Sequence, residues 1–202
     1  MVQYVRDYSD NERTKLKKEF LSAKPFHNLV LDGFFDSSKL KKVFQALLKE
    51  PFERKEADLF DLCQTQDLET SEDKALIEFR DYLRAKEFVS FIESITGLNL
   101  RAGKISIAGS LYEDGNYLLC HDDQLEGRKI AFMIYFSDLN IRDGGSLDLF
   151  SSSKGKPKDI VKSIQPKFNR FAFFEVSKTS FHQVREVIGK QRFAIGGWFY
   201  GR

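Results

Sequence analysis

Residues 129–138 read KIAFMIYFSD, a short run of β-branched and aromatic residues that begins soon after a glycine and ends in polar residues. Such a run, bounded by turn signals, is typical of a β-strand. Comparable runs follow one another beyond residue 100; they read KISIAGSLY, GSLDLF, IVKSIQP, RFAFFEVS, FHQVREV and RFAIGGWFYG. About eight short strands in succession predict a sandwich, a jelly roll or a barrel. Residues 151–158, SSSKGKPK, are predicted to form a surface loop.

The first hundred residues favour helices, with one strand inserted. Residues 9–23 offer Ser9 or Asp10 as an N-cap and stop before Pro25, where a helix is expected to end. Residues 27–35, HNLVLDGFF, alternate enough to predict a strand. A helical layer packed on one face of a jelly roll would bury the apolar side of the helices and the apolar side of the sheet at once.

Residues 36–50 carry the clearest helical pattern. Asp36 is a capping residue and Pro51 follows the segment, while an apolar stripe of helical period runs between them. The stripe consists of Leu40, Val43, Phe44, Leu47 and Leu48. Residues 71–97 contain two further stripes, closed by Gly97 as a C-cap. The polar segment 53–70 has no clear assignment, although LFDLC at 59–63 is compatible with a short strand.

These patterns predict an α+β, mainly β fold in which flanking helices from about residue 1 to 100 cover a β-rich part from about 101 to 202. With 202 residues and 42% hydrophobic side chains, we expect one domain with a substantial core. A formal net charge of +2, without a long basic run, gives no reason to expect a nucleic-acid partner.

The sequence shows no signal peptide and no run near the roughly 18 apolar residues of a membrane span. We expect a soluble protein of the cytoplasm and/or nucleus. The two cysteines, Cys63 and Cys120, form no CxxC pair, which fits a reducing compartment. A nucleophilic Cys120 beside a histidine is less favoured than a buried structural cysteine.

The stretch CHDDQLEG places one of only three histidines next to two acids. In a strand, residues two apart face the same side, so His121 and Asp123 can point at one spot while Asp122 faces away. With 30 acidic residues in the chain, this spacing also arises by chance and is compatible with a simple salt bridge.

A second histidine, His182, lies in the segment SFHQV between apolar neighbours. Two histidines and one carboxylate form the facial triad of non-heme iron sites, which leaves coordination positions open for chemistry. A closed zinc site needs a fourth protein ligand. His27 is a candidate for that ligand, but a surface or core role is favoured.

Arg192 opens the last predicted strand. A buried guanidinium needs a carboxylate partner, which a bound ligand or a protein side chain can supply. From spacing alone, a ligand carboxylate and a surface pair with Glu175 or Glu186 are equally favoured.

Several longer stretches resemble the 2-oxoglutarate and iron(II)-dependent dioxygenases. The motifs are HDD at 121–123, DGGSLDLF at 143–150, FFEVSKTSFHQV at 173–184 and QRFAIGGWF at 191–199. The stretch LLCHDDQLEGRKIAFMIYF is similar to the catalytic domain of eukaryotic ribosomal prolyl 3-hydroxylases. KPFHNLVLDGFF and DLFDLCQTQDL extend the resemblance from about residue 24 onward.

This resemblance implies a double-stranded β-helix, a jelly roll flanked by helices. It implies that His121, Asp123 and His182 hold Fe(II), that Arg192 binds the distal carboxylate of 2-oxoglutarate and that Tyr135 adds a phenolic hydrogen bond. Without the resemblance, a core role would be favoured for Tyr135. The implied cofactors are Fe(II), 2-oxoglutarate and O2, with ascorbate as a further candidate.

Two features depart from the family. Many of its members have a serine two residues after the arginine, where this chain has Ala194, so the pocket should lose one hydrogen bond worth roughly 1 kcal/mol. Well-known relatives also continue into a second β-helix domain that lacks the metal ligands. Here we expect a single-domain relative or a catalytic domain alone.

The resemblance implies a protein partner, with a proline in the small-subunit ribosomal protein at the decoding centre as the substrate. An acidic rim for a basic peptide is compatible with the positions of Glu113, Asp114, Asp122 and Glu126, although acids in loops are usually only solvated. One rival is the same chemistry on a different proline-containing protein. The other is a non-catalytic β-helix that serves as a binding module.

Overall fold

The computed structural model describes residues 2–202, which form four α-helices and eleven β-strands. The helices are α1 (Asp10–Ser22), α2 (Ser37–Leu47), α3 (Lys74–Arg84) and α4 (Lys86–Thr96). The strands are β1 (Asn28–Leu31), β2 (Glu53–Ala57), β3 (Phe60–Gln64), β4 (Leu100–Tyr112), β5 (Tyr117–His121), β6 (Arg128–Tyr135), β7 (Leu147–Ser153), β8 (Lys156–Ile164), β9 (Phe171–Glu175), β10 (His182–Val184) and β11 (Arg192–Gly201).

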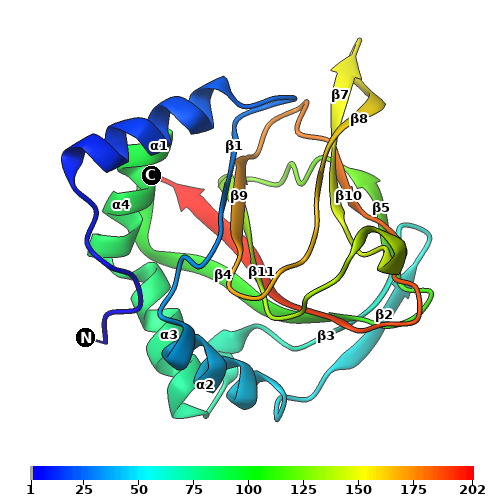
Figure 1. Ribbon diagram of the computed structural model, residues 1–202, viewed down its shortest axis with the longest axis horizontal. Coiled ribbons are helices and arrows are strands. Elements are labelled where there is room, and N and C mark those ends of the chain that lie inside the picture. The colour runs from blue at the N-terminus through cyan, green and yellow to red at the C-terminus, as the bar shows by residue number, and fades with distance from the viewer. Residues whose placement is uncertain (1) are drawn as a thin grey trace.

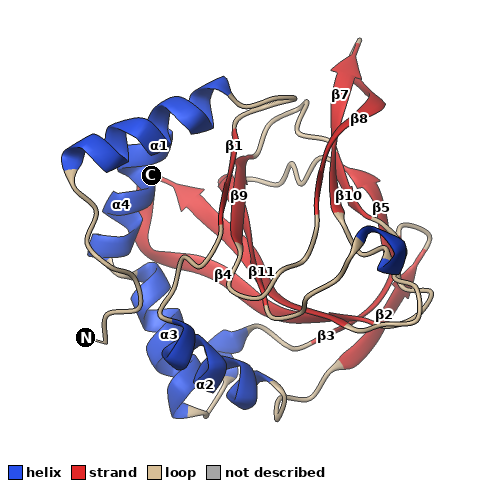
Figure 2. Cartoon of the chain, viewed as in Figure 1, coloured by secondary structure: helices blue, strands red, loops and turns tan. Residues whose placement is uncertain are grey.

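The strands form one strongly curved sheet with the order β1-β9-β6-β11-β4-β3-β5-β10-β7-β8, and β2 pairs with β3. Every strand pair is antiparallel. The sheet has two walls, one built around β9, β6 and β11 and the other around β5, β10 and β7, while the helices cover the outside of the first wall (Figures 1 and 2). The predicted jelly roll with flanking helices is confirmed.

Strand β6, which contains the run KIAFMIY, has apolar side chains buried on both faces. Ile130, Phe132 and Ile134 pack with the helices, whereas Ala131 and Tyr135 on the opposite face pack inside the sheet. Because successive strand residues point to opposite faces, a strand that lies between two apolar layers needs a nearly continuous apolar sequence. The helices therefore share one buried cluster with the outer face of β6. The inner face of β6 belongs to a second buried cluster, which lies beside the site.

The helix termini follow the predicted signals. Ser9 caps α1 in a reciprocal capping box with Glu12, Asp36 caps α2, and Gly97 ends α4 with a φ of 74°. The prediction that Leu48 belongs to the buried stripe is wrong: it is the C-cap residue of α2 and is 45% exposed. No helix within residues 2–202 is long and apolar enough to cross a membrane.

Two hairpins form in segments that have no clear assignment from the sequence or are predicted as a loop. Residues 53–64 form the β2–β3 hairpin, in which every residue of β2 is exposed and thus carries no apolar signal. The loop prediction for 151–158 is wrong, because β7 and β8 continue to a two-residue turn at Lys154 and Gly155. Both turn residues have positive φ, which is the geometry of tight hairpins.

Candidate metal centre

The two imidazoles of the predicted triad meet because β5 and β10 are antiparallel neighbours. His182 lies directly opposite His121 in the register of this pair, and the two ring centroids are 4.2 Å apart. Directly opposed residues in antiparallel strands have adjacent side chains. The β5–β10 pairing thus brings together two residues that are some sixty positions apart in the sequence.

Each histidine is oriented by a carbonyl two residues earlier in the chain. His121 Nδ1 lies 2.9 Å from the Leu119 carbonyl oxygen, and His182 Nδ1 lies 2.9 Å from that of Ser180. A carbonyl only accepts, so each Nδ1 carries the hydrogen in these bonds. In the neutral ring, Nε2 then keeps its lone pair, as a metal ligand requires.

Asp123 completes the cluster, but not for the reason that strand alternation suggests. Strand β5 ends at His121, and Asp123 lies in the following loop with a φ of 60°. This left-handed backbone, uncommon for residues other than glycine, turns the carboxylate back toward the imidazoles. Its two oxygens lie 3.5 Å from His121 Nε2 and 3.4 Å from His182 Nε2. The alternation argument is wrong, although the residue that it selects is at the site.

The three side chains offer one metal ligand atom each, and these atoms lie within 4.8 Å of one another. Burial opposes the charge on Asp123, yet the adjacent imidazoles of His121 and His182 hold the pKa of its carboxyl well below its usual range. Burial lowers the pKa of His121, but the neighbouring Asp123 carboxylate outweighs it and the net shift is upward. The carboxylate is therefore ionised at neutral pH, the form that binds a cation.

Arg192 is fully buried in the same sheet interior. Its Nε donates a 2.9 Å hydrogen bond to the Gly145 carbonyl, while Nη1 and Nη2 have no hydrogen-bond partner among residues 2–202. The alternative of a surface pair with Glu175 or Glu186 is wrong, because Arg192 is 0% exposed and Glu175 instead contacts His27 at 2.7 Å. A buried guanidinium with two free donors is costly unless a ligand supplies the acceptor.

Two tyrosines lie against this guanidinium. The Arg192 guanidinium carbon is 5.0 Å from the ring centroid of Tyr135 and 4.8 Å from that of Tyr112. Burial raises the pKa of Tyr112 to about 12 and also raises the pKa of Tyr135, with the Arg192 charge opposing both shifts. Both hydroxyls therefore stay protonated and can donate.

Tyr112 was not identified from the sequence. It lies opposite Arg192 in the β4–β11 register, and that pairing is the signal that would have identified it. The Tyr135 hydroxyl is buried and has no hydrogen-bond partner among the described residues. The same is true of Arg192 Nη1 and Nη2.

The residues present fit the two groups that the resemblance implies. Two imidazole nitrogens and one carboxylate match the ligand set of non-heme Fe(II), and a three-residue set leaves positions for other ligands. The free donors of Arg192 and Tyr135 match a carboxylate, which can take two parallel hydrogen bonds from a guanidinium. A 2-oxo dicarboxylate would accept hydrogen bonds from the unpaired donors of Arg192 and Tyr135.

The remaining candidates lie outside the cluster. His27 pairs with Glu175 and does not act as a fourth ligand. Glu113 and Asp114 follow β4 and bond to Gln191 and to the Gly189 backbone, at the end of β5 opposite to Asp122 and Glu126. The four acids therefore do not form the predicted single rim, because a strand separates the two pairs.

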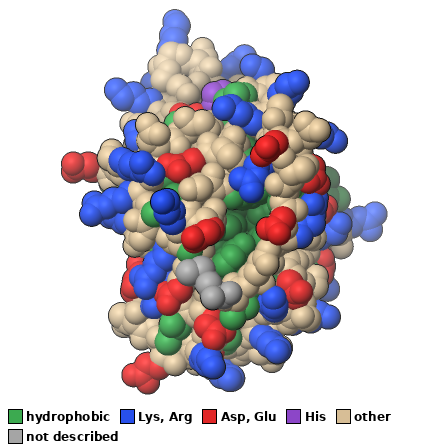
Figure 3. Space-filling view, turned by 90° about the vertical axis from the view of Figure 1, so that its left-hand side faces the viewer, with side chains coloured by type: hydrophobic (Ala, Val, Ile, Leu, Met, Phe, Trp, Pro, Cys, Tyr) green, Lys and Arg blue, Asp and Glu red, His purple; other side chains and the backbone are tan. Residues whose placement is uncertain are grey.

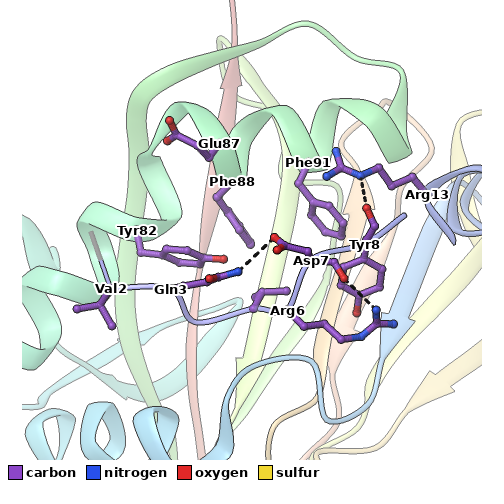
Figure 4. A pocket seen from close by; sticks show the side chains of 11 residues that line it. Val2, Gln3, Arg6, Asp7, Tyr8, Arg13, Tyr82, Glu87, Phe88 and Phe91 are labelled. Carbon is purple, nitrogen blue, oxygen red and sulfur yellow. Dashed lines mark hydrogen bonds between the residues drawn. The ribbon is translucent and has the colours of Figure 1, made fainter. Parts of the chain in front are cut away.

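A cavity of about 400 Å³ lies on the helical face, between the N-terminal segment and helices α3 and α4 (Figure 4). Figure 3 shows this face hollowed near its centre, with apolar side chains surrounded by acidic and basic ones. Tyr82, Phe88 and Phe91 contribute its aromatic lining, and Arg13 Nε donates a 3.1 Å hydrogen bond to the Tyr8 carbonyl beside it. The five predicted site residues lie elsewhere, within or next to the sheet.

Comparisons with known proteins agree with this geometry. Residues 107–200 match the family described as the 2OG-Fe(II) oxygenase superfamily. The prolyl 3-hydroxylase OGFOD1 of Mus musculus is 39% identical over 186 residues, which cover 90% of this chain and 34% of that protein. The prolyl 3,4-dihydroxylase OGFOD1 of Ostreococcus tauri is 36% identical over 197 residues, covering 87% of this chain and 38% of that protein. The chain spans little more than a third of these relatives' length.

Solved structures share the fold at low sequence identity. A prolyl-4-hydroxylase from Pseudomonas putida superposes with a TM-score of 0.75 at 16% identity, over 94% of this chain and 99% of that one. A Trichoplax adhaerens prolyl hydroxylase, solved with a hypoxia inducible factor peptide fragment, has a TM-score of 0.72 at 18% identity, over 95% and 90%. The sequence matches, the shared fold and the His-Asp-His cluster show that the chain contains a domain of the 2OG-Fe(II) oxygenase superfamily.

Proposed function

We propose that this protein is a 2-oxoglutarate- and Fe(II)-dependent prolyl hydroxylase that acts on a protein substrate. One observation carries the proposal: the buried, unpaired guanidinium of Arg192 lies in the same sheet interior as the His121–Asp123–His182 cluster. A binding module that had only retained the shape of the fold would gain nothing from a buried charge without a partner.

The site residues have separate tasks in this reaction. His121, Asp123 and His182 would hold Fe(II), which with 2-oxoglutarate and O2 supplies the oxidising power to place one oxygen atom in a substrate C–H bond, with succinate and CO2 as the other products. Arg192 would bind the far carboxylate of 2-oxoglutarate through its free nitrogens, and the Tyr135 hydroxyl would donate to the same group.

The apolar residues beside the cluster would limit the access of water to the reacting centre. The Phe174 ring lies 4.6 Å from the His182 ring, and Phe174 belongs to a buried cluster with Leu147 and Leu149. In such a lining, the charges of Asp123 and Arg192 are less screened than at the surface. Competing reactions with water would thereby be suppressed.

The substrate class follows from the relatives. Both curated relatives named above are prolyl hydroxylases, one for position 3 and one for positions 3 and 4 of the ring. We therefore propose that a proline is hydroxylated at position 3. The family resemblance described above further suggests, as the proposed substrate, a proline of the small-subunit ribosomal protein at the decoding centre. This substrate would place the protein in the cytoplasm and/or the nucleus. A different proline-containing protein is the second candidate.

A peptide assay tests the substrate proposal. The protein is incubated with Fe(II), ascorbate, 2-oxoglutarate and a peptide that spans the proposed ribosomal proline. We expect succinate release and a peptide mass gain of one oxygen atom, and neither with the Pro→Ala version of the peptide. Release driven equally by unrelated proline peptides would instead support the second candidate.

Ala194 offers a separate prediction about the co-substrate. It lies two residues from Arg192 on β11 and packs in the same buried cluster as Tyr135, so a serine hydroxyl there can reach the same carboxylate. One added hydrogen bond of about 1 kcal/mol should lower the KM for 2-oxoglutarate up to about fivefold in Ala194→Ser. Ala172→Ser in the same cluster, but on β9, is the matched control. An unchanged KM in Ala194→Ser would show that position 194 does not contact the co-substrate.

A further inference from the structure

A tryptophan of β11 contacts the carboxylate of the metal cluster. Trp198 Nε1 donates a 2.9 Å hydrogen bond to Asp123 Oδ2. The indole nitrogen is only a donor, so this bond has one direction and requires an ionised or accepting carboxylate oxygen. Trp198 packs against the inner buried cluster that contains Ala194 and Tyr135, and so lies on the same side of the sheet as the site.

Arg128, the first residue of β6, supports both partners of this bond. Its guanidinium carbon lies 3.4 Å from the Trp198 ring centroid, and its Nη1 lies 3.5 Å from Asp123 Oδ1. Tryptophan is the aromatic residue that attracts a cation most strongly. Arg128 therefore covers one face of the indole and presents its charge to the second carboxylate oxygen.

Asp123 needs such support because its own backbone gives little. It lies beyond the end of β5, outside the strand pairing, and its φ of 60° is a sparsely populated conformation. The two imidazole nitrogens are 3.5 and 3.4 Å from the carboxylate, which is beyond a good hydrogen bond. Among the described residues, the Trp198 N–H makes the shortest side-chain contact of this carboxylate.

We propose that Trp198 is a positioning residue for Asp123, and that Arg128 holds Trp198 in place. The indole N–H fixes one carboxylate oxygen, so that the carboxylate has a set orientation before a metal binds. Groups that orient a metal ligand in this way typically change metal affinity by about 10- to 100-fold when they are removed. This proposal rests on the metal site of the proposed function and concerns residues that the sequence alone did not identify.

Metal binding without turnover tests the proposal. Trp198→Phe removes the N–H and keeps an aromatic face for Arg128. In a Co(II) titration followed by visible absorption, we expect this variant to bind roughly 10- to 100-fold more weakly than the parent protein, with altered absorption bands at saturation. Arg128→Lys, which keeps the charge and loses the flat stacking surface, should fall between the two.

Tyr200→Phe is the matched control, because it removes a 2.7 Å hydrogen bond to Ser106 from the same strand, two residues further on. We expect this control to bind Co(II) as the parent does, and all variants to unfold at similar temperatures. Trp198→Phe with the affinity and bands of the parent, or an equal loss in Tyr200→Phe, would overturn the positioning role. Parent-like Co(II) binding by Asp123→Ala would instead refute the metal site itself.

Discussion

The Asp123→Ala and His182→Ala proteins are expected to release no succinate from 2-oxoglutarate above background. Each change removes one of three protein ligands, whose ligand atoms lie within 4.8 Å of one another. Two remaining ligands cannot fix a divalent metal in the position that faces the co-substrate. Succinate release with saturating Fe(II) and peptide is the measurement.

Asp122→Ala is the control for this experiment. Asp122 is adjacent in sequence, and its carboxylate accepts a 3.1 Å hydrogen bond from the Gln124 backbone instead of pointing at the imidazoles. We expect it to retain the activity of the parent protein. Turnover at the parent rate in both Asp123→Ala and His182→Ala would refute the assignment of the three ligands.

Arg192→Met is expected to raise the KM for 2-oxoglutarate by about 100-fold or more, because two charge-assisted hydrogen bonds of roughly 1.5 kcal/mol each would be lost. The ligand-free variant should be at least as resistant to unfolding as the parent protein, since methionine fills the space without two unpaired buried nitrogens. Opposite changes in co-substrate affinity and thermal stability are therefore the expected result.

Two measurements make this prediction specific. The KM is obtained from succinate release at varied 2-oxoglutarate, and the unfolding temperature is measured with and without the co-substrate. Arg101→Met, at an exposed position on β4, should change neither value. A KM near that of the parent in Arg192→Met would mean that another group anchors the carboxylate. A large fall in stability would mean that the guanidinium has a structural role.

The sequence patterns predicted a mainly β fold with flanking helices, and the family resemblance narrowed this fold to a jelly roll and implied the ligand set. The strand signals beyond residue 100 and the helical stripe at 36–50 depend on the spacing of apolar residues along the chain. This spacing reflects which face of each element is buried. The outer end of the β7–β8 hairpin, residues 151–158, was predicted as a loop because these strand ends are polar and mostly exposed and have no apolar alternation to reveal them. Local pattern predicts an element well only when one of its faces is buried.

The details of the site depended on strand register, which local sequence does not contain. His121 and His182 meet through the β5–β10 pairing, and Tyr112 reaches Arg192 through the β4–β11 pairing. Asp123 was selected by an alternation that its loop does not have. Trp198 gave no signal because its hydrogen bond depends on how that loop folds back over β11.

Strand β11 carries contacts to both ends of the proposed co-substrate site. Arg192 begins the strand and Trp198, which holds Asp123, lies six residues later. Between them, a side chain at Gly197 would collide with the Ser106 carbonyl of β4, so glycine allows β11 and β4 to approach closely there. The spacing between Arg192 and the residue that contacts Asp123 is thus set within a single strand. We expect the site to select its dicarboxylate by chain length, and to reject 2-oxo acids that have one methylene more or fewer.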